Sequence, residues 1–297
     1  MILAIGEILF DVYPDRQHLG GAPFNFVFHL KQLGMPVTFV TRIGDDAAGK
    51  EILGVLEEYN FNTAHVQVDS KKSTGKVLVE LDKDKTPHFN ILSDVAYDNI
   101  EFDPSLDTLL LNDVQLIYFG TLVQRTPNGF ATIQKILSRK GPETKCLYDV
   151  NLRPDCYSEK IVIESLKNTD ILKLNKDELN FIRKIVVDKK DKPNFIQNLL
   201  EEYKIEIIAI TKGKKGSALI SDAGSFQIKA NQNESVIDTV GAGDAYAAML
   251  ALGHLKNWPI SRTLSLAHQF AARMCTIKGA LPEHTEIYRK IIQMMEG

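Results

Sequence analysis

The sequence predicts an α/β fold with a mainly parallel central sheet flanked by helices, and a small β-sheet lid beside it. Three observations predict this fold. Short apolar runs alternate with amphipathic stretches, most of these runs lack polar alternation, and one segment breaks the plan by alternating. Apolar runs of this kind are typical of parallel strands covered on both faces. Their alternation with helices implies βαβ units with right-handed crossovers.

The elements follow from these patterns in chain order. Apolar runs predict core strands at residues 1–5, 37–40, 114–119, 145–150, 170–174 and 205–210. Amphipathic stretches predict helices at residues 24–33, 48–59, 127–139, 158–168, 176–185 and 192–203. Glycine-containing turns within residues 205–230 predict hairpins after the last of these strands. Three further helices are expected at residues 242–255, 260–277 and 283–295.

The lid is predicted from two pieces of chain, at about residues 9–20 and 74–98. In TGKVLVEL, Val77 and Val79 alternate with Leu78 and Glu80, and a turn rich in Asp and Lys joins this strand to a second one. A sheet with one apolar face needs a cover, which can be a ligand, a partner subunit or both. Since no Pro/Ser-rich linker divides the chain, we expect residues 1–297 to form one domain with a protruding lid.

Composition excludes several classes of protein. The 297 residues carry a net charge of −3 without a basic run, so no nucleic-acid surface is expected. No apolar run is long enough for a membrane span, and Glu7 and Asp11 interrupt the apolar N-terminus, which lacks the basic start of a signal peptide. The three cysteines, Cys146, Cys156 and Cys275, fit no zinc spacing and predict reduced, buried thiols. We expect a soluble, cytoplasmic protein.

Two stretches imitate nucleotide-binding motifs. GDDAAGKE, residues 44–51, nearly matches a P-loop, but Glu51 replaces the Ser or Thr that would meet magnesium, and two aspartates would face the phosphates. GAGDAY nearly matches the dinucleotide fingerprint, but Tyr246 replaces the third glycine and the stretch lies late in the chain. We interpret the first as a loop before a helix and set the second aside.

The stretch DTVGAGDAYAAML, residues 238–250, has two glycines at an expected helix start and an aspartate in the first turn. Backbone N–H groups of residues 241–244 would point outward there and, with the helix dipole, form an anion hole suited to phosphate. Asp244 beside this hole fits a base that takes a hydroxyl proton while the amides stabilise a phosphoryl group. A helix-capping role explains the same position, and the stretch alone leaves both readings open.

Two further stretches supply polar groups for a bound molecule. In LGGAPFN, Gly20 and Gly21 permit close backbone approach, and Asn25 offers a donor and an acceptor to hydroxyl groups. A simple turn before a helix is the alternative. DVNLRP places Asn151 and Arg153 directly after a strand, where polar groups line the crevice of an open α/β sheet. Arg153 can grip phosphate oxygens.

The stretch NKDE follows the strand at residues 170–174. Asn175 and Glu178 are three residues apart and share a helix face if the helix begins there. This spacing is that of a capping box. An amide and a carboxylate at these positions could instead hold the water shell of a magnesium ion.

Together, these stretches resemble the ribokinase-like, PfkB-type carbohydrate kinases over essentially the whole chain. The matching motifs occur in the family's order: GE.LFD, GGAP.N, RIGDDAAGK, TGKVLVEL, DVNLRP, NKDE, TKGKKGSAL, DTVGAGDAY and KGALP. The resemblance implies a ribokinase-like fold and a sugar kinase that uses ATP and Mg²⁺. It also identifies GDDAAGK as a family loop.

The resemblance also implies roles for individual residues. It makes Asp244 the base that deprotonates a sugar hydroxyl, with Arg153 near the transferred phosphate. The anion hole is formed by Gly241, Ala242 and Gly243. The sugar site comprises Asp11, Gly20, Gly21, Asn25, Tyr97, Asp98, Asn151 and Asp244. The nucleotide site comprises Asn175, Glu178, Thr211, Lys212, Gly213, Gly216, Gly241, Gly243, Gly279 and Ala280. Glu178 would hold Mg²⁺ through water, and Asp238, with the backbone near Val240 and Ala280, resembles a monovalent-cation site for K⁺.

The sugar is expected to be fructose, phosphorylated at its C6 hydroxyl. Ala22-Pro23 after the paired glycines, the opening GE.LFDV.P and the stretch DVAYDN at 94–99 look like fructokinases. Departures from the family pattern occur at Phe24, Phe26, Phe28 and Val150, which could reshape packing behind the pocket. 2-Keto-3-deoxygluconate, ribose or a nucleoside is the alternative substrate within the family.

The sequence also bears on two other classes of function and on one form of assembly. A non-catalytic sugar- or nucleotide-binding regulator would be favoured by loss of the base or the anion loop, and both are present. A nicotinamide-dependent enzyme would need an early glycine fingerprint, which the chain lacks. If the lids of two chains pair over the sugar, the protein is a homodimer, and closure would exclude water from the reaction.

Overall fold

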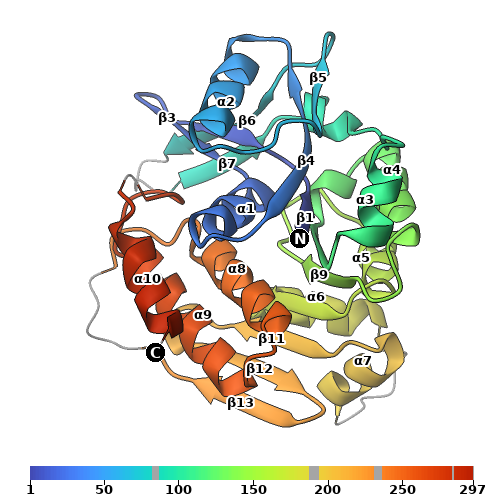
Figure 1. Cartoon of the computed structure of the whole chain (residues 1–297), viewed down its shortest axis with the longest axis vertical. Coiled ribbons are helices and arrows are strands. Elements are labelled where there is room, and N and C mark those ends of the chain that lie inside the picture. The colour runs from blue at the N-terminus through green and yellow to red at the C-terminus, as the bar shows by residue number, and fades with distance from the viewer. Residues whose placement is uncertain (82–86, 187–193, 231–235, 283, 297) are drawn as a thin grey trace.

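The computed structural model describes residues 1–81, 87–186, 194–230, 236–282 and 284–296. Within these residues the larger sheet has nine strands, in the order β13-β12-β11-β10-β9-β8-β1-β4-β5 (Figure 1). Their bounds are β1 Ile2–Ile5, β4 Val37–Gly44, β5 Val66–Asp69, β8 Leu116–Gly120, β9 Lys145–Asp149, β10 Ile171–Asn175, β11 Ile207–Thr211, β12 Ser217–Ser221 and β13 Gly224–Ile228.

The strand directions confirm the predicted mainly parallel sheet. From β5 to β11 every neighbouring pair is parallel, and only β12 and β13 are added in antiparallel fashion. The hairpins expected within residues 205–230 are therefore present. Strand β5 was not predicted. It is an edge strand whose sequence, VQVD, buries only Asp69, so it carries little apolar signal.

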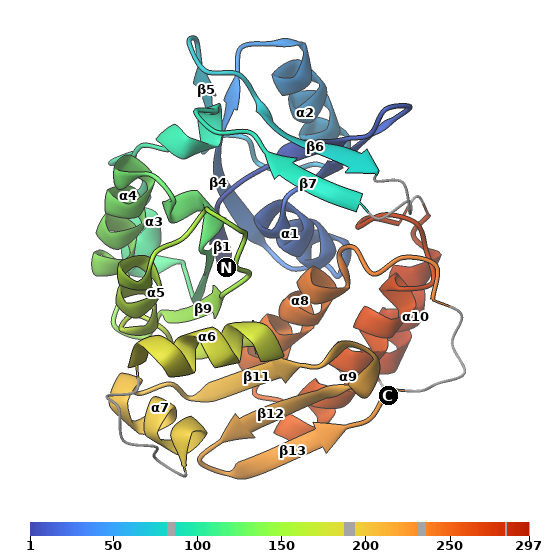
Figure 2. The same ribbon diagram turned by 180° about the vertical axis from the view of Figure 1, so that it is seen from behind.

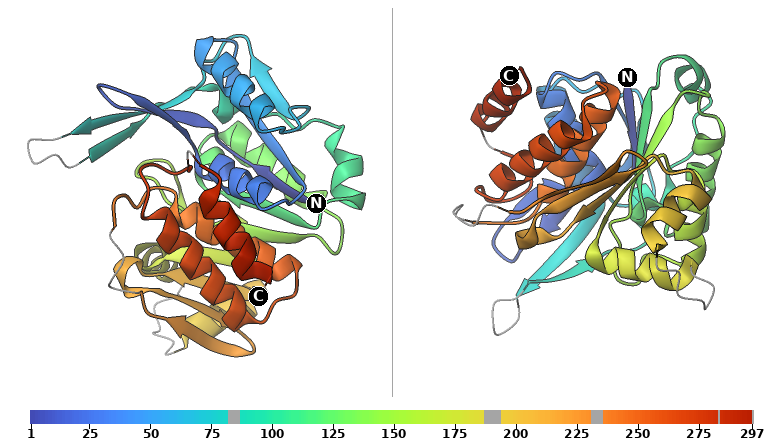
Figure 3. Two further views of the ribbon diagram at one scale, coloured as in Figure 1. Left: turned by 60° about the vertical axis from the view of Figure 1, so that its left-hand side comes forward. Right: turned by 90° about the horizontal axis from the view of Figure 1, so that it is seen from below.

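Ten helices are described, and they cover both faces of the larger sheet (Figure 3, right). Their bounds are α1 Ala22–Gln32, α2 Ala47–Glu58, α3 Leu106–Asn112, α4 Pro127–Ser138, α5 Glu159–Leu166, α6 Lys176–Val186, α7 Phe195–Tyr203, α8 Ala242–Leu255, α9 Ile260–Met274 and α10 Glu286–Glu296. The core under α1, α2 and α8–α10 is separate from the core under α3–α7. Nine of these helices overlap predicted ones, and the short α3 was missed. The start of the helix predicted at 192–203 and of that at 283–295 lies outside the described residues.

Helix α8 occupies the centre of one layer, where it packs against α1 and α9 (Figures 1 and 2). Ten of its residues are buried, and most are Ala, Leu or Gly, which lets neighbouring helices approach closely on several sides. The bulky residues of α1 fill the space behind it. Phe26 stacks on Tyr118 with 3.9 Å between ring centroids, and Phe24 contacts Phe28 and Phe39. The phenylalanines that depart from the family pattern thus pack against aromatic side chains of other elements in the core, including Phe39, Tyr118 and Tyr288.

A smaller sheet stands out from the body of the protein (Figure 3, left). Its four described strands have the order β3-β2-β6-β7, with bounds β2 Leu9–Val12, β3 Gln17–Gly20, β6 Gly75–Leu81 and β7 Pro87–Ile91. They fall within the two pieces of chain predicted for the lid, and Val77 and Val79 are buried as its alternation implies. The predicted turn rich in Asp and Lys lies outside the described residues. The single-domain organisation and the role of this sheet as a lid remain predictions.

The fold also bears on the expectations about membrane spans and about buried cysteines. In the described ranges, no helix combines the length and the apolar character that a bilayer crossing requires. Cys146 and Cys156 are buried as predicted, whereas Cys275 is only half-buried. The expectation was wrong for Cys275 because α9 ends at Met274, so the thiol lies at a helix end rather than inside a core.

Candidate active site

The candidate site is centred on the N-terminal end of α8. Gly241 precedes the helix with φ at +76°, a left-handed conformation that favours glycine. A Cβ atom at Gly241 would lie 2.5 Å from the Cα of Ala280, so the absence of a side chain lets the two loops touch. Asp244 follows in the first turn of α8 and is 9% exposed. The helix start and Ala280, both assigned to the nucleotide site by the family resemblance, therefore lie together.

Helix α1 brings a second polar group to Asp244. Gly21 has φ at +110°, and a Cβ there would lie 2.5 Å from the Glu7 carbonyl oxygen, so the turn before α1 needs glycine. Asn25, in the first turn of α1, donates a hydrogen bond of 2.8 Å from Nδ2 to Asp244 Oδ2. The buried Asn25 Oδ1 has no hydrogen-bond partner. It is thus an acceptor that a hydroxyl group of a bound molecule can satisfy.

The environment of Asp244 raises its pKa to about 6. Burial is the largest cause, since a low-dielectric site disfavours the charged carboxylate. The hydrogen bond from Asn25 and the charge of Lys173 act in the opposite direction, and the charge of Asp149 adds to the rise. A carboxylate with this pKa is largely ionised at neutral pH and is still basic enough to accept a proton.

A buried ion pair lies next to Asp244, between neighbouring strands β9 and β10. Lys173 Nζ donates to both carboxylate oxygens of Asp149, at 2.8 and 2.7 Å. Tyr118 donates its hydroxyl hydrogen to the same carboxylate at 3.1 Å. Sequence reasoning assigned no role to Lys173. The signal was present, because a lysine inside the apolar run DILKL requires a buried partner.

Two acidic side chains from the start of the chain complete this side of the site. Glu7 is 5% exposed, and burial raises its pKa to about 7. Its Oε2 has no hydrogen-bond partner. Asp11 on β2 has its pKa raised to about 6 by burial, and a Cβ at Gly20 would lie 3.2 Å from Asp11 Oδ2. The charge of the exposed Arg153, the arginine predicted to grip phosphate, lowers both pKa values. Glu7 was missed, although it interrupts an apolar run.

The start of α6 has the geometry of a capping box. Asn175 Oδ1 accepts hydrogen bonds from the backbone N–H groups of Asp177 and Glu178, and Glu178 Oε2 accepts from the N–H of Asn175 at 2.7 Å. Glu178 Oε1 accepts from the N–H of Leu152, which anchors the loop that carries Asn151 and Arg153. Each carboxylate oxygen retains a lone pair for a water molecule. This arrangement fits a magnesium ion held through water rather than by a protein cage.

Of the two residues predicted for the sugar site in DVAYDN, Asp98 is fully engaged by protein. Its carboxylate forms hydrogen bonds of 2.7 and 2.8 Å with Arg125, and it also accepts from the N–H of Val95 at 3.2 Å. Asp98 is 1% exposed. Tyr97 is buried beside it, but its hydroxyl has no hydrogen-bond partner, and the charge of Glu7 contributes to raising its pKa. Tyr97 is therefore the better placed of the two to meet a ligand.

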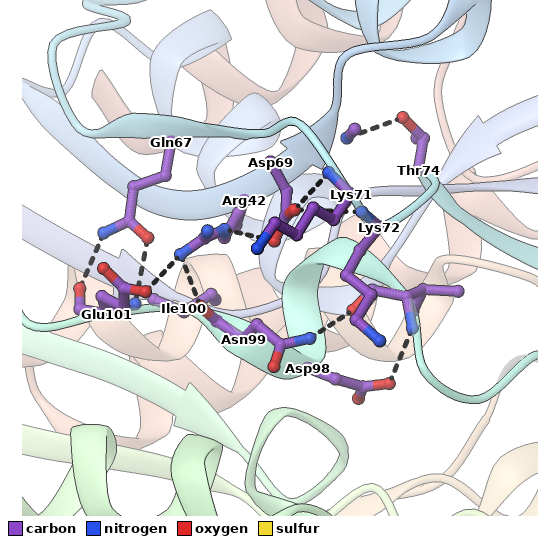
Figure 4. Close-up of polar contacts among 12 residues, drawn as sticks. Arg42, Gln67, Asp69, Lys71, Lys72, Thr74, Asp98, Asn99, Ile100 and Glu101 are labelled. Atoms are coloured by element: carbon purple, nitrogen blue, oxygen red, sulfur yellow. Dashed lines mark hydrogen bonds and ion pairs between the residues drawn. The ribbon is translucent and has the colours of Figure 1, made fainter.

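The segment after Tyr97 is held from its other side by Arg42 on β4 (Figure 4). Arg42 forms ion pairs with Asp69 at 2.9 Å and Glu101 at 3.0 Å, and donates to the carbonyl oxygen of Asn99 at 2.8 Å. These contacts tie residues 99–101, which follow β7, to strands β4 and β5 of the larger sheet. The Asp98 carboxylate is held separately, by Arg125 and the N–H of Val95.

A cavity of about 710 Å³ opens beside the start of α8. Ala242 and Gly243 line it, together with Thr211, Gly213 and Gly216 from the predicted nucleotide segment. Lys212, Gly279 and Ala280 are not among its lining residues, although Gly279 donates its N–H to Asp238 at 3.0 Å. The remaining lining residues include Tyr246, His268, Ala271, Ala272 and Cys275. Its size is typical of small-molecule and cofactor sites.

Asp238 ties the loop before α8 to the loop at residues 278–280. Its two carboxylate oxygens accept hydrogen bonds from the backbone N–H groups of Val240, at 3.1 Å, and Gly279, at 3.0 Å. No group of three or more His, Cys, Asp or Glu side chains suited to a metal ion occurs in the ranges described above. Any cation at Asp238 would depend on backbone oxygens and water, so this site stays a prediction.

Comparison with known proteins gives a consistent result. The family model described as "pfkB family carbohydrate kinase" matches residues 10–286. A protein of Pyrococcus horikoshii described as an uncharacterized sugar kinase is 29% identical over 273 residues, which cover 86% of this chain and 83% of the relative. Its crystal structure in complex with ATP has a TM-score of 0.81 and 26% identity, covering 98% of this chain and all of that one. The fructokinase of Salmonella typhimurium is 25% identical over 296 residues, covering 94% of each chain. A 5-dehydro-2-deoxygluconokinase of Geobacillus kaustophilus is 22% identical over 318 residues, covering 99% of this chain and 94% of the relative.

Proposed function

Because the chain belongs to the pfkB family of carbohydrate kinases, we propose that it transfers the γ-phosphate of ATP to a primary hydroxyl of fructose, giving fructose 6-phosphate. One observation carries this proposal. The hydrogen bond of 2.8 Å between Asn25 and Asp244 joins two helices. One is α1, which carries the proposed sugar ligand Asn25, and the other is α8, whose first residues line the cavity. A hydroxyl and a phosphate bound on the two sides of Asp244 would therefore be neighbours.

In the proposed reaction, Asp244 accepts the proton of the sugar hydroxyl as its oxygen attacks the γ-phosphorus, and ADP leaves. Asn25 orients the carboxylate through Nδ2 and can accept from a second sugar hydroxyl through Oδ1. The N–H groups of Gly241 and Gly243 would bind the oxygens of the transferred group, where the helix dipole favours negative charge, whereas those of Ala242 and Asp244 donate to the carbonyl oxygens of Thr239 and Gly241. Asp11 and the hydroxyl of Tyr97 are proposed to bind the sugar.

The nucleotide is proposed to occupy the cavity of about 710 Å³ beside Gly243. The relative crystallised with ATP supports ATP as the nucleotide. Asn175 and Glu178 would hold Mg²⁺ through water, and the ion would neutralise charge on the phosphates. Asp238 is proposed as the place of a K⁺ ion, whose effect is measured by comparing activity in potassium and in choline salts.

The choice of fructose rests on sequence likeness to fructokinases, which the Salmonella relative supports. A second candidate is a keto sugar acid, because relatives named 5-dehydro-2-deoxygluconokinase also align over almost the whole chain.

A coupled assay of ADP release with a panel of sugars tests the proposal. The panel contains fructose, ribose, 2-keto-3-deoxygluconate, 5-dehydro-2-deoxygluconate and adenosine, each with ATP and Mg²⁺. We expect the highest kcat/KM with fructose and a product phosphorylated at C6. A higher kcat/KM with a sugar acid would replace fructose by the second candidate, and turnover of none of these acceptors would overturn both.

A further inference from the structure

Lys173 is a buried cation that the proposed reaction does not yet use. Its side chain is 9% exposed, and among the described residues the Arg125 side chain, which is 8% exposed and paired with Asp98, is similarly buried. Lys173 Nζ donates to both oxygens of Asp149 on the neighbouring strand. Placing two charges inside a protein is costly in solvation, and an apolar pair of similar volume is often equally stabilising.

The neighbouring positions show that strand pairing does not require these charges. Lys173 and Asp149 are register partners, and the pair two residues earlier on the same face, Ile171 and Leu147, is apolar. The ladder between β9 and β10 is therefore compatible with an apolar pair. The charged pair occurs instead at the carboxyl ends of the strands, under the start of α8.

The Lys173 ammonium group lies close to Gly243. A Cβ atom at Gly243 would lie 3.5 Å from Lys173 Nζ, so the amine lies against the turn whose N–H groups form the anion hole. Three carboxylates act on the amine at this point. Asp149, Asp244 and Glu178 all favour its charged form, which keeps the pKa of Lys173 raised despite its burial.

We propose that Lys173 is a positioning residue for phosphoryl transfer, which holds Asp149 and places a positive charge beneath Gly243. This inference rests on the proposed function. Three carboxylates near the anion hole would repel a phosphate, and the ammonium group offsets part of that repulsion. Lys173 thereby acts through the turn and through Asp244, without touching the sugar.

A purely structural pair and a positioning pair differ in their effect on Asp244. The charged and titratable groups that act on Asp244 are Lys173 on β10, Asp149 on β9, Arg153 after β9, Glu7 after β1 and Tyr118 on β8. Among them, Lys173 lowers the pKa of Asp244 and Asp149 raises it. Removing one or the other should therefore move the pH profile in opposite directions.

The experiment compares three variants with the wild type: Lys173→Met, Asp149→Asn and the double variant. The acidic limb of kcat/KM reports the pKa of the free enzyme's base. We expect this limb to move to higher pH in Lys173→Met and to lower pH in Asp149→Asn. Both single variants should melt at lower temperature, because each leaves one buried group without its partner, and the double variant should recover most of that loss.

The double variant separates folding from function. We expect it to remain about 10- to 100-fold below wild type in kcat, although its melting temperature recovers. In Lys173→Met, affinity for ATP, measured by calorimetry, should fall by about 10-fold while affinity for ADP changes by less than about 3-fold, since this variant loses the positive charge and keeps the three carboxylates. Recovery of wild-type kcat in the double variant, or single variants with unshifted pH profiles, would overturn the proposal.

Failure of the proposed function gives a different pattern. If the wild type phosphorylates no sugar but Lys173→Met still loses affinity for ATP and not for ADP, the assignment of Lys173 to the phosphate turn stands and the substrate assignment is wrong. If affinity for ATP is also unchanged, the assignment of Lys173 is overturned as well.

Discussion

Asn25 in the first turn of α1 donates a hydrogen bond of 2.8 Å to Asp244 in the first turn of α8. The two residues are separated by 219 positions in the sequence. Each of the two helices begins after a glycine with positive φ, and both glycines are in close backbone contact with another segment. The relative position of Asn25 and Asp244 is thus determined by two rigid turns rather than by flexible side chains.

Asn25→Asp should place a second carboxylate against Asp244. Like charges at this distance raise the pKa of the pair, so we expect kcat/KM at pH 7 to fall by about 10-fold or more and to recover partly at higher pH. Asn25→Leu is the control, because it removes the hydrogen bond without adding charge. An Asn25→Asp enzyme with the same pH profile as Asn25→Leu would contradict this coupling.

Asp244→Asn tests the assignment of the base. The amide keeps the shape of the side chain but cannot accept the hydroxyl proton, so kcat should fall by about 10²- to 10⁴-fold. The sugar KM should change by less than about 3-fold, because Asn25 and Asp11 remain in place. Initial rates at saturating ATP measure both constants, and turnover near that of wild type would exclude Asp244 as the base.

The stability of the same variant should depend on pH with a definite sign. The pKa of Asp244 is raised to about 6 in the folded protein, so the native state keeps a proton that the unfolded chain releases. Stability from this group therefore decreases as pH rises from about 4 to 6. Asp244→Asn should be more stable than wild type at pH 8, by about 1–3 kcal/mol, and equal to it near pH 4. Denaturant unfolding at the two pH values measures this, and a variant less stable at pH 8 contradicts it.

Much of this site could be predicted from the sequence because its motifs are local. Gly241 and Asp244 are read from one stretch, and Gly21 and Asn25 from another, since glycine and short polar side chains at helix starts have few alternative explanations. The strands before them follow from apolar runs. The meeting of the two stretches could be expected only from the family resemblance, because no local pattern joins residues so far apart.

Other features depend on contacts that local patterns do not contain. Asp98 looked like a sugar ligand in the sequence, yet its carboxylate is paired with Arg125, a residue without any motif. Lys173 and Glu7 were visible as charges inside apolar runs, but their partners come from other strands and helices. Buried charges of this kind show from sequence that something must pair with them, and only the fold shows what.

A comparison of Gly241 and Gly279 separates the cost of a strained backbone conformation from the cost of a steric contact. Both have positive φ, at +76° and +78°, but a Cβ would meet Ala280 at Gly241 and nothing within 4 Å at Gly279. Gly279→Ala should cost about 1–2 kcal/mol of stability from its backbone conformation alone. Gly241→Ala should cost more and should also weaken ATP binding, because the turn that carries the anion hole must move. Calorimetry and thermal melts compare them, and equal effects of the two substitutions would contradict the role of the contact with Ala280.

The smaller sheet leads to a prediction about assembly. Phe89 on β7 is 54% exposed and is the register partner of the buried Val79, so it lies on the sheet face that also carries Val77. Asp11 is the register partner of Val77 on β2, which places Phe89 on the face of the proposed sugar ligand. We expect a second copy of the chain to cover the part of this face that carries Phe89, because the chain itself buries Val77 and Val79 but leaves Phe89 exposed.

Sedimentation equilibrium at micromolar concentration measures this association. The wild type should have the mass of a dimer, and Phe89→Ser should dissociate it and raise the sugar KM, since the proposed cover excludes water from the acceptor. Leu111→Ser is the matched control, because Leu111 is 61% exposed on α3, outside the smaller sheet. A monomeric wild type, or equal dissociation by both substitutions, would contradict pairing through this face. A dimer that dissociates without change in the sugar KM would separate assembly from the reaction and restrict the role of Phe89 to the interface.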